Sequence, residues 1–330
     1  MIQIRSYQEE DLPALVGLIN EAAAADHATW GLPPQPTTPQ ALYHQLHGPY
    51  QAPLRDVWVA EAASGAPVGC LRTQLRPGER ENLFAAHALV HPAYRGKGLG
   101  RRLLQAGLAL AQARRPETAD GRLVVQVTVD ERMTPGCALA ESLGLRPTRR
   151  FWEMAAPSLV GLPQPALPAG FGWRPLRLPD DLEALADLDR AAFMDHPGEE
   201  SMTAPEWAHE FAKAHGRPDL CFLAFAHGQA APAGYSMAEI SPEHMAQAGR
   251  QEGYIAGLGV RPIWRRRGLG LALLLQALDA LRREGMECAY LHMDGDNATS
   301  APRLYRRAGF GPRRCIIAYQ TVLQTEERPA

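Results

Sequence analysis

The chain has 330 residues, 46% of them apolar, and a formal net charge of −2 at pH 7. Because a single core rarely grows beyond about 250–300 residues, this length favours two domains of ordinary size. A charge so close to zero gives no overall attraction to nucleic acid or acidic membranes, so we expect neither as a partner.

The first half of the chain alternates between strand-like and helix-like patterns. Apolar alternation predicts strands at 2–5, 57–61, 68–73, 83–90, 122–129 and 149–154. Helices are expected to begin near Asp11, at Leu99 and at Pro135. Residues 22–55 are rich in Ala, Pro, His and Gln, and we expect a helical excursion with loops there.

The second half repeats this order after residues 157–171, whose four prolines and two glycines are typical of a linker. Strands are predicted at 220–226, 233–240, 254–260, 288–293 and 315–322, and helices at 181–193, 269–283 and 301–307. This order indicates an α/β protein with mixed sheets flanked by helices. We therefore expect domains at 1–156 and 172–330, joined by the linker 157–171.

Two loops carry the same pattern, Val-x-Pro-x-[Tyr/Trp]-Arg-x-x-Gly-x-Gly, and each leads into an apolar run. They span residues 90–100 and 260–270, and their arginines, Arg95 and Arg265, lie 170 positions apart. The helix starts at Asp11-Leu12 and Asp181-Leu182 repeat with the same offset. The repeat is therefore a whole domain rather than a coincidence of composition.

Each loop is predicted to join a strand to a helix. Pro92 and Pro262 cannot donate to a sheet ladder, so each strand should end there. The glycines allow a ligand to approach the backbone, and the first helical turn presents unpaired N–H groups at a positive dipole end. This combination favours phosphate. A basic turn before an ordinary core helix is the alternative.

The Arg-x-x-Gly-x-Gly pattern resembles the acyl-CoA pyrophosphate loop of the GNAT (general N-acetyltransferase) superfamily, over nearly the whole chain. The resemblance implies two GNAT-like domains in tandem, with acetyl-CoA as acyl donor and no metal. In that family, strands flanking the central helices splay apart and admit the thioester. The implied cofactor-binding residues are Leu258, Gly259, Val260, Arg265, Arg266, Arg267, Gly268, Leu269 and Gly270, and in the first copy Leu89, Val90, Arg95, Gly96, Lys97, Gly98, Leu99 and Gly100.

Residues 294–310 resemble the family segment that carries the proton donor for the leaving thiolate. By that resemblance Tyr305 is the general acid and Asn297 helps to hold the cofactor. A tyrosine with a pKa near ~10 can protonate a thiolate of comparable basicity, although Tyr305 could instead be a core residue with a wet hydroxyl. Setting Gly144-Leu145 against Gly309-Phe310 puts Ala140 opposite Tyr305, so we expect the first domain to be non-catalytic.

The general base is left open by the sequence. Glu239 and Glu252 flank the strand into the second loop, and each is a candidate or else a solvated strand-edge charge. The layout also resembles the mycothiol synthases, a family of tandem GNAT enzymes whose base is a glutamate on that strand. Here Tyr254 occupies the place of that glutamate, which argues against assigning the same substrate.

The sequence thus favours an acetyl-CoA-dependent N-acetyltransferase that acts on the primary amine of a small molecule, with its chemistry in the second domain. The alternatives are a non-catalytic acyl-CoA sensor and an enzyme that acetylates a protein or peptide amine. Five scattered cysteines without Cys-x-x-Cys spacing, and no apolar leader, predict a cytoplasmic protein. The internal repeat favours a monomer, with a homodimer as the alternative.

Overall fold

The computed structural model describes residues 2–32, 37–47, 51–78, 81–117, 122–194, 201–212, 216–295 and 301–323. The described chain divides into two compact units. Unit 1 takes the residues up to Arg150 and those from Cys315 onward, and unit 2 takes Phe151–Arg314. Each unit is a mixed sheet with helices, so the predicted α/β class and the tandem arrangement are confirmed.

The sheet of unit 1 has the strand order β1-β2-β3-β4-β5-β12. Neighbouring strands are antiparallel, except that β4 and β5 are parallel. The strands are β1 (Gln3–Ser6), β2 (Val57–Glu61), β3 (Pro67–Arg76), β4 (Glu81–Val90), β5 (Arg122–Asp130) and β12 (Gly311–Leu323), of which the residues from Cys315 belong to this unit.

Helices cover both faces of this sheet. Gly69 and Leu71 of β3 contact α4 (Leu99–Arg114), whereas Cys70 packs in the cluster that holds Leu15 of α1 (Leu12–Trp30). Successive strand residues point to opposite faces, so α1 and α4 lie on opposite sides. The other helical segments are η1 (Glu9–Asp11), α2 (Pro39–Leu46), α3 (Pro53–Asp56), η2 (Pro92–Tyr94), η3 (Arg115–Glu117) and α5 (Thr134–Ser142).

Unit 2 repeats the pattern with the strand order β7-β8-β9-β10-β11-β6. Here β10 and β11 are the parallel pair. The strands are β6 (Arg146–Ala156), β7 (Phe171–Pro175), β8 (Cys221–Ala226), β9 (Pro232–Glu239), β10 (Glu252–Val260) and β11 (Cys288–Asp294). The helical segments are α6 (Leu182–Phe193), α7 (Ala204–Phe211), η4 (Pro218–Leu220), α8 (Pro242–Ala248), η5 (Pro262–Trp264), α9 (Leu269–Arg283) and α10 (Ala301–Arg307).

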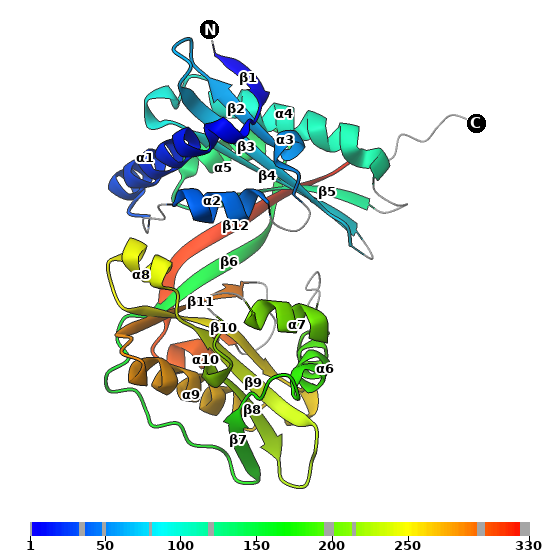
Figure 1. The fold of residues 1–330 in the computed structure, drawn as a ribbon, viewed down its shortest axis with the longest axis vertical. Helices are drawn as coiled ribbons and strands as arrows, with labels where there is room; N and C mark the ends of the chain where they lie inside the picture. Colours follow the sequence, from blue (N-terminus) through cyan, green and yellow to red (C-terminus); the bar gives the residue numbers. More distant parts are fainter. Residues whose placement is uncertain are drawn as a thin grey trace, which may run out of the picture. The chain divides into compact units, whose positions relative to one another are not determined.

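Alternation along β8 explains how unit 2 is layered. Phe222 and Ala224 join the core under α9, while Cys221 and Leu223 join the core under α6 and α7. Figure 1 shows α9 and α6 on either side of the strands of this unit. Helix α9 is apolar around most of its circumference, and Leu273, Leu274 and Leu278 are fully buried. It is therefore a central core helix rather than a surface one.

The last strand of each repeat pairs in the sheet of the other unit. Residues 151–156 of β6 pair with β11 of unit 2, and residues 316–323 of β12 pair with β5 of unit 1. In Figure 1 the orange-red ribbon of β12 runs alongside β5. The compact units therefore differ from the chain-order domains 1–156 and 172–330 by an exchange of two strand segments.

The proline-rich segment before β7 packs on unit 2. Leu159 is 1% exposed, and its N–H donates to the Glu287 carbonyl at 2.8 Å. Leu162 and Leu167 also contact the core that surrounds α9. Prolines keep this segment extended, and its leucines bind it to the helix. Residues 157–170 therefore form a packed strap on unit 2 in this structure.

Ending the chain after Arg314 should destabilise unit 1 selectively, because Ile317, Ala318 and Tyr319 are buried there and β5 would become an edge strand. We expect the amides of β5 to lose at least about 4 kcal/mol of protection against hydrogen exchange, the order of magnitude for removing large buried side chains. Mass spectrometry of exchanged peptides measures this. A chain ended after Leu323 is the control, and unchanged exchange in β5 would contradict the expected role of β12.

Candidate functional site

Unit 2 contains a cavity of about 280 Å³ where β10 and β11 separate. The two strands are paired as far as Ile255 and Leu291, although β10 continues to Val260. Beyond that pair, residues of both strands line the cavity. Its lining consists of Asp189, Phe193, Ser201, Met202, Trp207, Tyr235, Ile255, Ala256, Gly257, Leu258, Leu291, His292, Met293, Asp294 and Tyr305.

A bulge in β10 and one tyrosine set the shape of this wall. The register of β10 against β9 shifts between Ile255 and Gly257, which locally increases twist. The ring of Tyr235 lies against Gly257 and Gly259, and a Cβ on Gly259 would sit 2.5 Å from it. Only glycine fits there. The edge of β10 that has separated from β11, called the parted edge below, therefore carries small residues whose backbone is open to the cavity.

Tyr235 also connects the cavity wall to a helix. Its hydroxyl donates to the Asp189 carboxylate of α6 at 2.6 Å. Burial raises the pKa of Asp189, while this hydrogen bond and one from the backbone of Met202 oppose the rise. Asp189 is 7% exposed. Sequence reasoning missed this pair, because the two residues are 46 positions apart and no local pattern links them.

The second glycine loop joins β10 to α9 as predicted. Gly268 caps the helix at φ 86°, and Arg266 has φ 62°, the only positive φ at a non-glycine residue in the described chain. Arg266 corresponds to Gly96 of the first loop, where φ is 71°. A left-handed conformation costs an L-residue about 1–2 kcal/mol. The first N–H groups of α9 lack intrahelical acceptors and face the loop.

The two aligned arginines hold their loops together. The Arg265 Nε donates to the Val260 carbonyl at 3.1 Å and its NH2 group to the Ala192 carbonyl at 2.8 Å. The Arg95 Nε likewise donates to the Val90 carbonyl, and its other side contacts Asp26. These guanidinium groups thus connect strand, loop and the preceding helix within each unit. Phosphate contact from this loop would come chiefly from the backbone and from its exposed cations.

Exposed cations occupy matched positions in the two loops. Arg267 lies over the ring of Trp264, 4.8 Å from its centre, and Lys97 lies 5.4 Å from the ring centre of Tyr94. The remaining residues predicted to bind cofactor are in equivalent places. Leu258, Gly259 and Val260 end β10; Leu89 and Val90 end β4; Leu269 and Gly270, like Leu99 and Gly100, form first helical turns after Gly268 and Gly98.

Tyr305 lies on α10 and lines the cavity. Its ring meets Phe310 edge-on, with ring centres 6.1 Å apart. Asn297 lies outside the described residues. In unit 1 the corresponding position, Ala140 of α5, is fully buried and has no hydroxyl. The geometry therefore brings the predicted acid to a cavity in unit 2 and offers no equivalent at Ala140.

Glu252 belongs to a cluster of ion pairs. Its carboxylate accepts from Arg313 at 2.6 Å and from His244 at 3.0 Å, and it pairs with Arg250 at 2.7 Å. Burial opposes ionisation, but these contacts outweigh it and lower the pKa of Glu252 to about 2. A carboxylate this acidic is a weak base at neutral pH. It is also absent from the residues that line the cavity, so the geometry does not favour Glu252 as the base.

Glu239 lies at the end of β9, opposite Tyr254 of β10. It is half-buried and does not line the cavity. Its negative charge, together with the larger effect of burial, raises the pKa of Tyr254. The geometry therefore does not place Glu239 in the cavity as a base. The titratable groups that do line the cavity are Asp189, Asp294 and His292, besides tyrosines.

Within the described residues, no three or more His, Cys, Asp or Glu side chains gather as ligands for a metal ion. None of their helices is both long and apolar enough to cross a membrane.

Comparison with known proteins identifies the class of protein that carries this fold and site. The acetyltransferase (GNAT) family model matches residues 182–310, and a second acetyltransferase (GNAT) domain model matches residues 53–144. The chain belongs to the GNAT family and is an N-acetyltransferase with two GNAT domains in tandem.

The chain is similar to known acetyltransferases over most of its length. The mycothiol acetyltransferase of Thermobifida fusca is 31% identical over 79% of this chain and 80% of its own. That of Streptomyces avermitilis is 31% identical over 93% and 91%. A crystal structure of a GCN5-related N-acetyltransferase from Sphaerobacter thermophilus has a TM-score of 0.81 and 26% identity, and covers 97% of this chain and 95% of that one.

Replacing Arg313 by Met should destabilise unit 2 by about 3–5 kcal/mol at pH 7, because two buried carboxylates, Glu153 and Glu252, would lose their shared cation. Both carboxyl groups have pKa values of about 2, below their ordinary 4.5. Their pairing therefore stabilises the fold above about pH 4.5, and this contribution is lost as the pH falls toward 2. The difference between variant and wild type should narrow below about pH 4.

Urea unfolding at pH 7, 5 and 3.5 measures this difference. Arg190→Met is the control, since Arg190 is 69% exposed in its pair with Asp187 and should contribute under about 1 kcal/mol. An Arg313→Met loss below 1 kcal/mol at pH 7, or a loss independent of pH, would contradict a buried cluster.

Proposed function

We propose that the protein transfers the acetyl group of acetyl-CoA to the primary amine of a small molecule, and that the chemistry takes place in unit 2. The observation that carries this proposal is that the parted edge of β10 and Tyr305 line one cavity, and that the glycine loop continues the same strand into α9.

The glycine loop suits the pyrophosphate of the donor. Unpaired N–H groups and the positive end of the α9 dipole favour a doubly charged anion, and Arg267 adds an exposed cation. The strained φ of Arg266 keeps the loop in a left-handed turn without glycine, which points to a constraint beyond stability. Residues 266–270 would therefore hold the donor through their backbone, while Arg265 holds the loop.

The cavity suits acyl transfer. The backbone of β10 at Ala256–Leu258 lines the cavity, and an N–H group on its parted edge would stabilise the oxyanion that forms when an amine attacks a thioester. The hydroxyl of Tyr305 is the proton donor for the departing thiolate. Unit 1 has the same loop but Ala140 at the matching position, and we propose that it is non-catalytic.

The acceptor is proposed as a small amine because the cavity is close to the lower end of ligand pockets in size. The relatives bear the name mycothiol acetyltransferase. This chain has Tyr254 where the mycothiol synthases resembled above have a glutamate, so its polar environment for an amine differs. A panel of amino sugars, polyamines, amino acids and the amine that the relatives acetylate would identify the acceptor.

Acetyl-CoA binding should depend on the second loop. Isothermal titration of Arg267→Glu should give an affinity at least tenfold lower, because the reversed charge faces the phosphate site. Lys97→Glu is the matched control, since both cations are exposed and both lie over an aromatic ring. If both variants lowered the affinity and the titration showed two acetyl-CoA sites per chain, unit 1 would also bind the donor. If neither variant changed the affinity, the proposal that the second loop binds acetyl-CoA would be contradicted.

Tyr305→Phe should lower kcat for amine acetylation by roughly 10²–10⁴ while acetyl-CoA binding is retained, because the variant lacks only the donor hydroxyl. Release of CoA thiol measures turnover, and Tyr290→Phe controls for the loss of a hydroxyl from the same unit but outside the cavity. An unchanged kcat would remove Tyr305 from the mechanism. Donor binding without acetylation of any small amine would favour a sensor, and acetylation of peptides alone would favour a protein substrate.

A further inference from the structure

A cluster of rings lies on the unit 2 sheet next to the cavity. Tyr254 of β10 and Tyr290 of β11 are stacked, with ring centres 4.8 Å apart. His244 of α8 stacks on the other side of Tyr290 at 4.7 Å. His292 follows along β11, 5.7 Å from Tyr254 and 5.8 Å from Tyr290. Of these four rings, only that of His292 belongs to the cavity lining.

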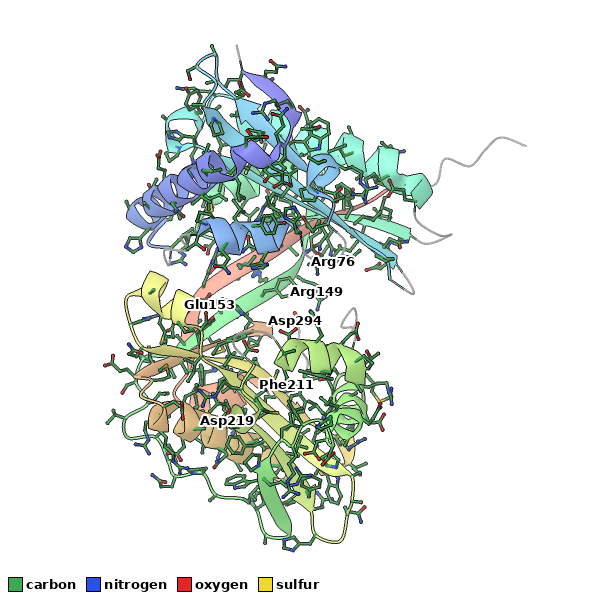
Figure 2. All side chains as sticks on the ribbon, in the orientation of Figure 1. Arg76, Arg149, Glu153, Phe211, Asp219 and Asp294 are labelled. Carbon is green, nitrogen blue, oxygen red and sulfur yellow. The ribbon has the colours of Figure 1, made fainter. Side chains whose placement is uncertain are left out.

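His292 is held between a carboxylate and a hydroxyl. Its Nε2 lies 3.4 Å from Oε2 of Glu153 on β6, and its Nδ1 lies 3.5 Å from the hydroxyl of Tyr254. Figure 2 marks Glu153 on its strand. The imidazole is 48% exposed, whereas Glu153 is only 3% exposed. Catalytic hydrogen bonds are often this long before substrate binds and shorten in the complex.

The carboxylate determines which ring nitrogen carries the proton. Burial opposes ionisation of Glu153, but hydrogen bonds from His292 and Arg313 lower its pKa to about 2. An ionised carboxylate can only accept, so Nε2 carries the hydrogen that points at Glu153. In the neutral ring Nδ1 is then left with its lone pair, which faces the hydroxyl of Tyr254.

We propose that His292 is the proton acceptor for the substrate amine, that Tyr254 relays the proton, and that Glu153 orients the imidazole. The inference rests on the proposed function and assigns its missing base. A carboxylate, an imidazole and a hydroxyl in series form the arrangement that hydrolases use to activate a nucleophile, here with the amine as nucleophile.

The proton balance closes with these groups. As the amine nitrogen bonds to the thioester carbon, one N–H proton passes to Nδ1 of His292, directly or through the Tyr254 hydroxyl, which receives one proton and gives another. The C–S bond breaks and the thiolate takes a proton from Tyr305. His292 then returns its proton to water through its exposed edge, and Tyr305 is reprotonated from solvent. The products are an acetamide and CoA thiol.

The other groups near the imidazole do not replace it. Burial and the charge of Glu239 keep Tyr254 protonated by raising its pKa. Glu252 is held by Arg313 and His244. Glu153 of β6, Tyr254 of β10 and Tyr290 of β11 are the groups in contact with His292. The other charged or titratable groups are one step further away: Asp294 is two residues on along β11, Arg313 of β12 pairs with Glu153, Glu239 of β9 is opposite Tyr254, and His244 of α8 stacks on Tyr290 and contacts Glu252.

The test is the pH profile of kcat/KM for the best amine of the panel, measured on the full chain. The wild type should lose activity on the acidic side, because a protonated base cannot accept the proton of the amine. His292→Gln should lower kcat/KM by roughly 10²-fold or more and remove the part of the acidic limb that is not due to protonation of the amine itself. Glu153→Gln should lower kcat/KM by roughly tenfold or more, because the imidazole loses the carboxylate that holds its tautomer and orientation.

His244→Gln is the matched control. His244 contacts Glu252 and stacks on Tyr290 much as His292 contacts Glu153, but it does not line the cavity. Its variant should keep the acidic limb in place. Nitrogen-15 histidine resonances give a second readout: the His292 signals are assigned by their loss in His292→Gln, and in Glu153→Gln they should report a changed tautomer of the ring.

The outcomes separate this inference from the proposed function. No acetylated amine from the wild type would reject the proposed function and the role of His292 together. Suppose instead that the wild type is active and that Tyr305→Phe slows it. If His292→Gln then kept a rate within threefold of the wild type and an intact acidic limb, the inference alone would be overturned. A fall in activity of Glu153→Gln with an unchanged tautomer of His292 would reduce Glu153 to a purely structural role.

Discussion

The ion pairs of Arg313 with Glu153 and Glu252 are the interaction on which the organisation of unit 2 depends. They join β12, β6 and β10 at one place, where both carboxylates are almost fully buried. A buried carboxylate without a partner would take up a proton or destabilise the fold. Because Arg313 keeps Glu153 ionised, Glu153 can also hold His292, so a structural cluster and a proposed catalytic group share one carboxylate.

The cavity depends on a second constraint, the separation of two parallel strands. Parallel neighbours normally continue side by side, but a bulge at Ala256 and the ring of Tyr235 against Gly257 and Gly259 turn β10 away from β11. Tyr235 is fixed in turn by Asp189. The opening between the strands is therefore produced by side-chain packing and by one buried hydrogen bond. Because the glycine loop follows β10 directly, the direction of this strand also sets the direction of the loop.

Local patterns in the sequence predicted the elements and both glycine loops, because helix and strand periodicity and the left-handed glycines at 98 and 268 are properties of short segments. The exchange of β6 and β12 could not be predicted, since either repeat offers an equally apolar last strand and pairing is decided by long-range contacts. The roles of Glu252 and Arg265 could not be predicted for the same reason. The sequence does not show which distant groups a charged side chain on a strand edge or loop will contact, and in the structure each of these two residues has several such contacts.

The comparison of the two units separates what maintains this fold from what gives it chemistry. The features common to both loops, such as Arg95 and Arg265 bonded to the strand that precedes them, hold the strand, loop and helix together. The features that differ lie elsewhere, at Ala140 against Tyr305 and at the ring cluster of unit 2. The sequence alignment that matches Ala140 with Tyr305 also matches Arg132 with Asn297; Arg132 is bonded to Asp130 and to the Gly31 carbonyl, so it serves the packing of unit 1. A duplicated loop is thus evidence for a duplicated scaffold, and activity must be argued from the few side chains that only one copy directs into a cavity.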